Sequence, residues 1–322
     1  MTPKFTTGAD LLGSWFADVE LGEAPIRFQL PEPFTNLDVR PGRLILFGGA
    51  PGGGKTAAIL QLGVDLLRMN PSARLLVANV EMVPALLVER IVSRLSGVPL
   101  TTIAERMLTA EQLGRVRASV ATLQPVAGRL AFLHAPFALE NVATAGTEFD
   151  ANVLVLDYIQ RFTVGDSKGD KREQLETAAT VLRGFCDTGA AVLVASAVSR
   201  QKGATGSNYS GLNLASFRGS SELEYGTDSA YLFVPDDTGA ITLQCGKNRY
   251  GPWPTSSRDS IRRPRRSRWH RRGLKRSTAR HQPQPRQRQR RRRGRHATID
   301  ALRSERAPWR NTSARCDVSR RR

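Results

Sequence analysis

The sequence of 322 residues is poor in cysteine and in long apolar runs, and each shortage excludes a class of protein. Its three cysteines, Cys186, Cys245 and Cys316, are widely spaced without a metal-ligand pattern, which favours reduced thiols over a disulfide framework. No apolar run approaches the roughly 18 residues of a membrane span, and the amino terminus lacks the basic and apolar stretches of a signal peptide. We therefore expect a cytoplasmic protein with no membrane partner.

Lysine and acidic residues are scarce at the carboxyl-terminal end. Residues 253–322 contain 24 Arg and one Lys against four acidic residues, whereas residues 1–252 contain 23 basic and 25 acidic residues. The net charge of +19 therefore comes from the end of the chain. Because this end also has few large aliphatic side chains, burial cannot offset the entropy lost on ordering it. We expect residues 253–322 to form a disordered, Arg-rich tail.

Three interpretations of this tail remain open. A solvated tail would bind nucleic acid electrostatically, with an affinity that falls steeply as salt rises. An arginine-rich motif for an RNA partner is the second interpretation. The third is a frameshift near Trp253, since a GC-rich gene read out of frame yields text rich in Arg, Pro and Ser. The encoding DNA tests the third, which is wrong if no other frame beyond codon 252 encodes strand-like sequence.

Residues 1–252 alternate apolar runs with helical patterns. The strands are expected at 43–47, 74–80, 129–134, 152–157 and 190–196, and the helices at 55–69, 84–95, about 173–187, and after the capping box of Thr109 and Gln112. Two later runs, 229–234 and 241–245, flank the turn "PDDTG" and predict a hairpin. Continuous apolar strands between helices indicate an α/β fold with a mostly parallel central sheet flanked by helices.

A helix ahead of this region has one apolar face. It includes Leu11, Leu12, Trp15, Phe16 and Val19. Two interpretations stay open: the helix packs on its own core, or it is an arm that docks on a neighbouring subunit.

The segment "GAPGGGKT" at 49–56 fits the P-loop pattern G-x-x-x-x-G-K-[ST] between an expected strand and an expected helix. Glycines let backbone N–H groups surround phosphate oxygens, and the helix amino terminus adds partial positive charge. The pattern predicts that a nucleoside triphosphate is bound with Mg²⁺, with Lys55 on the β- and γ-phosphates and Thr56 on the metal. The binding residues are expected to be Gly49, Ala50, Pro51, Gly52, Gly53, Gly54, Lys55, Thr56 and Ala57.

Two acidic residues follow apolar strands. Asp157 ends "VLVLD", the position at which α/β sheets place their ligands, and is expected to support Mg²⁺. Glu81 directly follows the strand at 74–80, which we expect beside the P-loop strand, and is a candidate to orient and deprotonate water.

From about Phe34 to Pro252 the chain resembles the motor domain of bacterial replicative hexameric helicases of the DnaB type, which has a RecA-like fold. The motifs that carry this resemblance are "GAPGGGKT", "NVEM", "LVLDYIQRF", "ASAVSR", "FRGSSELEYGTDSAYLF" and "KNR". The resemblance implies that Glu81 is the catalytic base and Asp157 a metal-binding residue, and Arg90 matches the family's spacing. It also divides the chain into an arm at 1–33, a RecA-like ATPase domain at 34–252 and the tail at 253–322.

The resemblance further implies a homo-hexamer whose neighbouring subunits share each nucleotide site. Lys247 and Arg249 would reach the neighbour's site and stabilise the γ-phosphate during transfer. Single-stranded DNA would pass through the ring, held by the loops at 163–172 and 201–218. The DNA-binding candidates in these loops are Lys168, Lys171, Arg172, Lys202 and Arg218. Replication, plasmid or phage initiation proteins are the partners that such a motor would meet.

The chain departs from the family at two places. Ala197 occupies the position of a Gln that senses the γ-phosphate and relays hydrolysis to the DNA loops, and only about 33 residues precede the motor, where the family has a primase-engaging domain. A replicative-type DNA helicase is the leading hypothesis. Ala197 favours the alternative, a RecA-like ATPase that acts as a nucleoprotein switch without unwinding. A non-enzymatic nucleic-acid binder that works through the tail is the third hypothesis.

Overall fold

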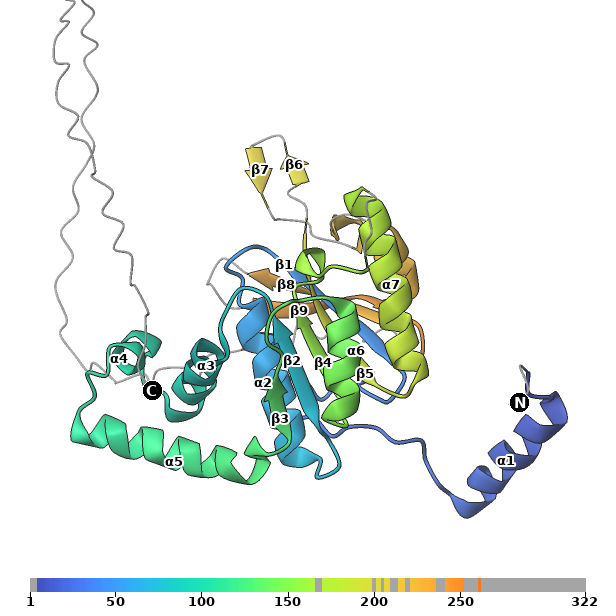
Figure 1. Cartoon of the computed structure of the whole chain (residues 1–322), viewed down its shortest axis with the longest axis horizontal. Helices are drawn as coiled ribbons and strands as arrows, with labels where there is room; N and C mark the ends of the chain where they lie inside the picture. The colour runs from blue at the N-terminus through green and yellow to red at the C-terminus, as the bar shows by residue number, and fades with distance from the viewer. Residues whose placement is uncertain are drawn as a thin grey trace, which may run out of the picture. The chain divides into compact units, whose positions relative to one another are not determined.

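The protein is described by a computed structural model, shown in Figure 1. The described residues are 5–165, 170–198, 201–203, 206–208, 214–217, 221–235, 241–251 and 260–261. The strands are β1 Leu44–Gly49, β2 Leu75–Asn79, β3 Leu130–Phe132, β4 Val153–Asp157, β5 Ala191–Ala197, β6 Gln201–Gly203, β7 Gly206–Asn208, β8 Ser229–Pro235, β9 Ile241–Asn248 and β10 Ser260–Ile261. The helices are α1 Gly8–Leu21, α2 Lys55–Met69, α3 Pro84–Ser96, α4 Leu100–Ala104, α5 Ala110–Ala127, α6 Leu139–Glu148, α7 Lys171–Asp187 and α8 Ser221–Gly226, with short 3₁₀ turns η1 Ile159–Arg161 and η2 Leu214–Ser216.

The larger sheet has eight strands in the order β10-β9-β8-β1-β5-β4-β2-β3 among the described residues. From β8 to β3 all neighbours are parallel, and β9 returns antiparallel to β8 as the predicted hairpin. This confirms the expected α/β fold with a mostly parallel sheet. Because parallel strands share one direction, their carboxyl ends all meet at the same edge of the sheet, where α/β proteins place their ligands.

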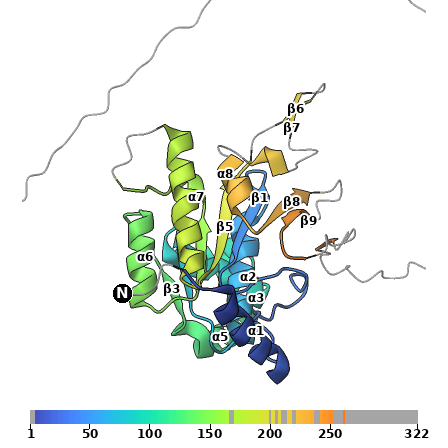
Figure 2. The ribbon, with the colours of Figure 1, turned by 90° about the vertical axis from the view of Figure 1, so that its right-hand side faces the viewer.

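Both faces of the sheet are buried, because successive side chains of a strand point to opposite sides. On one face, Leu46 of β1 packs in the same cluster as Leu182 of α7. On the other face, Phe47 packs in the same cluster as Leu62 of α2. Figure 2 shows α6 and α7 together on one side of the strands. The two helical layers explain why the strands read as continuous apolar runs rather than as alternating patterns.

Several elements begin or end differently from the expectation. Helix α7 begins at Lys171, two residues early, because Asp170 forms a capping box with Glu173. The capping box of Thr109 and Gln112 is present at α5, as predicted. Helix α6 was not predicted, since Leu139 and Val142 are its only buried residues and span a single turn. The loop expected at 201–218 contains a short antiparallel ladder of β6 and β7.

The amphipathic helix at the amino terminus does not pack on the body of its own chain. Within α1, which is described throughout, no residue is buried, and Trp15 and Phe16 are 60% and 53% exposed. The interpretation that α1 packs on its own core is therefore wrong. The alternative, an arm that docks on a neighbouring subunit, stays a prediction.

Gly48 lies in β1 directly before the P-loop, and the ring of Phe217 packs against it. A Cβ atom at Gly48 would lie 2.5 Å from the Phe217 ring and 2.9 Å from Leu232. We expect Gly48→Ala to lower the free energy of unfolding by about 1–3 kcal/mol, the usual cost of overpacking. Urea unfolding measures this loss. The control is Gly114→Ala in α5, where an added Cβ atom would meet no atom within 4 Å. This control should be neutral or stabilising by up to about 1 kcal/mol. Equal losses of unfolding free energy in the two variants would contradict the overpacking at Gly48.

Most of the Arg-rich tail lies outside the described residues. Its predicted disorder and its three interpretations therefore stay predictions. Ser260 and Ile261 are described, as β10, which pairs antiparallel with Thr242 and Ile241 of β9. Among the described helices, none is long and apolar enough to cross a membrane.

Candidate nucleotide and metal site

A cavity of about 750 Å³ lies at the carboxyl ends of the central strands. This volume lies within the usual range of roughly 300–1,000 Å³ for ligand pockets. Five separate segments supply its walls: the P-loop with the start of α2, the turn after β2, helix α3, the end of β4 and the end of β5. The lining residues are Pro51, Gly52, Gly54, Lys55, Thr56, Ala57, Glu81, Met82, Arg90, Asp157, Tyr158 and Ala197. Six of the nine P-loop residues expected to bind nucleotide are among them.

The P-loop turns tightly between β1 and α2, as its glycines require. Gly52 and Gly54 have φ angles of 73° and 80°, a region that side chains disfavour. The turn is closed by a hydrogen bond from Gly53 N to Ala50 O, and a Cβ atom at Gly53 would lie 2.9 Å from that oxygen. The loop backbone therefore depends on glycine at each of these three positions.

Lys55 begins α2 and folds back over the loop. Its Nζ donates to the carbonyl oxygens of Gly49 (2.8 Å) and Ala50 (2.9 Å). Burial lowers the pKa of the Lys55 ammonium, while Asp157 and Glu81 act in the opposite direction. An anionic phosphate beside the Lys55 ammonium would compensate for the hydration that the ammonium loses on burial. This environment suits a lysine that binds a triphosphate.

Thr56 and Asp157 bring two hard oxygen ligands to one point. Thr56 Oγ1 donates to Asp157 Oδ2 over 2.5 Å, although the residues are 101 positions apart. Asn79 Nδ2 donates to the same oxygen over 2.9 Å. Mg²⁺ prefers oxygen ligands and is commonly held by one or two carboxylates together with substrate phosphates. The hydroxyl of Thr56 and the carboxylate of Asp157 therefore fit a magnesium ion next to the P-loop.

Asp157 is 5% exposed, and burial raises the pKa of its carboxyl group, with Glu81 acting in the same direction. Hydrogen bonds from Thr56 and Asn79 and the charge of Lys55 lower the pKa but do not cancel the effect of burial. Ionisation of Asp157 is therefore less favourable in the protein without ligand than it is in water, and a bound cation would offset this cost.

Asp157→Asn is expected to raise the melting temperature of the ligand-free protein near neutral pH. A carboxyl whose pKa is raised by folding stabilises the fold below its unfolded pKa, and this stability is lost as pH rises through the folded pKa. A neutral Asn avoids the loss, so the difference between variant and wild type should grow as pH rises. Each 1 kcal/mol corresponds to about 2–4 °C in a folded domain of roughly 150–250 residues. Thermal unfolding between pH 4 and 8 measures the difference, and equal melting temperatures across this range would contradict the account.

Glu81 lines the cavity, but the strand before it does not lie where it was expected. The prediction that its strand lies beside the P-loop strand is wrong, because β5 and β4 separate β1 from β2. The chain turns after β2, and Asn79 Oδ1 accepts hydrogen bonds from the backbone N of Glu81 (3.0 Å) and Met82 (2.8 Å). This turn directs Glu81 back towards the P-loop.

Asn79 is a site residue that sequence reasoning missed. It is 4% exposed and joins Asp157 on one side to the backbone of Glu81 on the other. A polar residue at the end of an otherwise apolar strand was the available signal, because a buried amide requires partners. Asn79 fixes the two candidate acids relative to each other.

Lys247 and Arg249 lie at the opposite end of the sheet from this cavity. Lys247 pairs with Ala230 at the start of β8, whereas Gly49 of the P-loop pairs with Phe233. The separation along β8 is on the order of 10 Å. The structure therefore does not bring these two residues to the nucleotide cavity of their own chain.

Both cations instead contact the end of α8. Lys247 Nζ donates to the carbonyl oxygens of Glu224 (2.5 Å) and Tyr225 (3.1 Å), and Arg249 donates to Tyr225 O (2.7 Å) and Asp228 Oδ1 (3.4 Å). Carbonyls at a helix carboxyl terminus are favourable partners for cations. Burial and the nearby Arg249 lower the pKa of Lys247.

The five DNA-binding candidates are described only in part. Lys168 and Arg218 lie outside the described residues. Lys202 lies in β6 and Lys171 begins α7. Arg172 is exposed, and its Nε donates to Glu176 over 2.8 Å. Their convergence on one DNA strand stays a prediction.

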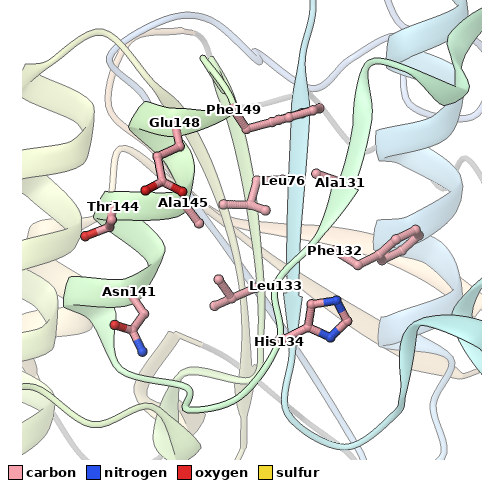
Figure 3. Close-up of a pocket in the computed structure, with 10 residues that line it drawn as sticks. All are labelled: Leu76, Ala131, Phe132, Leu133, His134, Asn141, Thr144, Ala145, Glu148 and Phe149. Carbon is pink, nitrogen blue, oxygen red and sulfur yellow. The ribbon is translucent and has the colours of Figure 1, made fainter.

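A second cavity, of about 510 Å³, lies apart from all these residues, between α6 and the edge strand β3. Figure 3 shows it lined by apolar side chains such as Leu76, Leu133 and Phe149, with Glu148 and His134 near its margin. None of the predicted site residues lines it.

Comparisons with known proteins identify a family and a fold. The family described as "DnaB-like helicase C terminal domain" matches residues 34–257. No curated protein matches the sequence. A solved structure of another protein's ATPase domain is similar with a TM-score of 0.67 and 17% identity, over 77% of this chain and 93% of that one. A second, "The Structure Of A DnaB-Like Replicative Helicase And Its Interactions With Primase", has a TM-score of 0.65 and 16% identity, over 77% of this chain and 63% of that one.

The two solved structures confirm the expected RecA-like fold. The family match covers well over half of the chain and includes the P-loop, Glu81, Asp157 and the Lys247–Arg249 segment. The chain belongs to the family of DnaB-like helicase C-terminal domains.

Proposed function

We propose that the protein is a ring-forming motor that hydrolyses ATP with Mg²⁺ and moves along single-stranded DNA. The observation that carries the proposal is a divided site. The P-loop, Asp157 and Glu81 meet in one cavity, whereas Lys247 and Arg249 lie at the far end of the sheet. A second copy that placed its cations against this cavity would complete it, and head-to-tail repetition of that contact closes a ring when the rotation between neighbouring copies divides a full turn.

In this function each residue of the cavity has a separate role. The P-loop amides and Lys55 bind the β- and γ-phosphates. Thr56 would hold the metal, with Asp157 supporting its coordination shell. When bound, Mg²⁺ neutralises charge on these phosphates. Asn79 holds Asp157 and the Glu81 turn in place.

Glu81 acts on the attacking water. As the water oxygen bonds to the γ-phosphorus, the bond to the β–γ bridging oxygen breaks and the Glu81 carboxylate accepts a proton of the water. Glu81 is the suitable group because its carboxylate lines the cavity and is exposed, so that it can meet a water molecule.

Arg249 and Lys247 act on the neighbouring subunit's nucleotide. Charge develops on the γ-phosphate oxygens during transfer, and an arginine finger from another subunit stabilises it. In the single chain these cations are held by backbone carbonyls of α8. A triphosphate is a stronger partner for a cation than a carbonyl, so that docking of a neighbour favours the exchange.

The arm formed by α1 supports the ring. Its apolar face is exposed in the single chain, which in a soluble protein marks an interaction site. We assign this face to the neighbouring subunit. Replication, plasmid or phage initiation proteins would be the motor's partners.

A nucleoprotein switch without unwinding is the second candidate function. The observation that favours it is Ala197, which lines the cavity at the end of β5 with a methyl group and cannot hydrogen-bond a phosphate through its side chain. Strand displacement on a forked DNA duplex separates the two functions. The motor predicts ATP-dependent displacement by wild type and none by Lys55→Ala, whereas hydrolysis without displacement would support the switch.

A further inference from the structure

The backbone pairing of β4 with β5 stops short of the nucleotide cavity. Its last pair is Leu156 with Val194, whereas β5 continues to Ala197 and there pairs with Gly49 of the P-loop on its other side. Beyond Asp157 the chain leaves β4 and enters η1. The two neighbouring strands therefore separate at the edge where the ligand is expected to bind.

The side chain of Gln160, in η1, crosses this gap. Its Nε2 donates to Ser196 Oγ over 2.7 Å, and its Oε1 accepts from the backbone N of Ala197 over 3.1 Å. An amide side chain offers one acceptor and two donors, and so can hold a backbone much as a paired strand would. Ser196 is fully buried, and hydrogen bonds are stronger in such surroundings.

Gln160 thereby joins the starting points of both predicted DNA loops. η1 leads to Thr163, where the loop at 163–172 begins. β5 leads to Val198, which forms a bridge with Phe217 and so ties the two ends of the second loop together. Ala197, directly before Val198, lines the nucleotide cavity. Since Ala197 has only a methyl side chain, its backbone is the part that Gln160 can hold.

We propose that Gln160 is a positioning residue that couples the nucleotide site to both DNA loops. A shift of Ala197 during the nucleotide cycle is carried through Gln160 to η1, so that both loops move together. This inference rests on the proposed motor function and deepens it. It assigns the coupling to a side chain that does not line the nucleotide cavity.

The test is Gln160→Leu in the full chain, with turnover of ATP measured with and without an oligothymidine strand. We expect the ratio of DNA-stimulated to basal turnover to fall about tenfold, within the usual range for coupled sites. Basal turnover, the Kd of a fluorescent ATP analogue and the melting temperature should stay close to wild type. A merely structural role would lower these quantities together.

Three matched variants sharpen the test. Gln160→Glu keeps an acceptor for Ala197 N and can accept from the Ser196 hydroxyl, so it should retain most of the stimulation. Ser196→Ala removes one of the two contacts and should lose part of it, and the double variant with Gln160→Leu should be no worse than Gln160→Leu alone. Gln124→Leu makes the same change on the exposed surface of α5 and should have no effect.

The outcomes separate this inference from the proposed function. If DNA stimulates wild type and Gln160→Leu equally, the coupling role is overturned while the motor function stands. A parallel fall of basal and stimulated turnover in Gln160→Leu also overturns the coupling role. If DNA stimulates neither protein although wild type hydrolyses ATP, the motor function fails and the coupling role with it.

Discussion

Arg249→Ala is expected to lower ATP turnover by the assembled protein by about 10³- to 10⁵-fold, the range for loss of an arginine finger. The physical reason is that developing charge on the γ-phosphate loses its partner from the adjacent subunit. Steady-state phosphate release at saturating ATP measures the effect. The control is Arg68→Ala at the end of α2, because Arg68 also forms an ion pair of 3.4 Å, with Asp65, but lies away from the P-loop. A loss similar to that of the control would contradict the assignment.

Mixing two inactive variants tests whether Arg249 acts on the neighbour. Lys55→Ala subunits keep the finger and lack the P-loop lysine, whereas Arg249→Ala subunits keep the P-loop and lack the finger. In randomly mixed rings at equal amounts, about a quarter of the head-to-tail interfaces pair an intact P-loop with an intact finger. Turnover should therefore reappear on mixing. A mixture as inactive as its components would place Arg249 in its own chain's site.

Glu81→Gln is expected to lower turnover by about 10²- to 10⁴-fold, the usual contribution of a general base, while ATP still binds. An amide keeps the shape of the side chain and loses the ability to accept the proton from water. Phosphate release gives the turnover, and titration with a fluorescent ATP analogue gives the Kd.

Glu105→Gln, an exposed position at the end of α4, is the matched control and should retain wild-type turnover. Glu81→Gln with near-normal turnover would mean that another group activates the water. A large rise in Kd would instead assign Glu81 to binding.

The parts of the site that follow one another in the chain were predictable from the sequence. The P-loop needs glycines where φ is positive and a lysine at the start of a helix, and these are local requirements. Asp157 was predictable because strand ends in parallel sheets face the ligand. The apolar runs also indicated a sheet covered on both faces, as observed.

Interactions between distant segments were not predictable. In the sheet, β5 and β4 lie between β1 and β2. This order was not predictable, because apolar runs of similar composition do not reveal which strands are neighbours. Asn79 bonds to Asp157 from 78 positions away, and Gln160 reaches Ser196 from 36 positions away. The exposure of α1 excludes packing on its own core. The sequence could not show this, because an apolar helix face does not reveal which surface it packs against.

The most direct test of the proposed motor is the ATP turnover of the full chain with and without single-stranded DNA, with Lys55→Ala alongside. For the proposed motor we expect hydrolysis that depends on Lys55 and rises several-fold or more when DNA is added. Hydrolysis that persists in Lys55→Ala, or a wild-type rate indifferent to DNA, would contradict it.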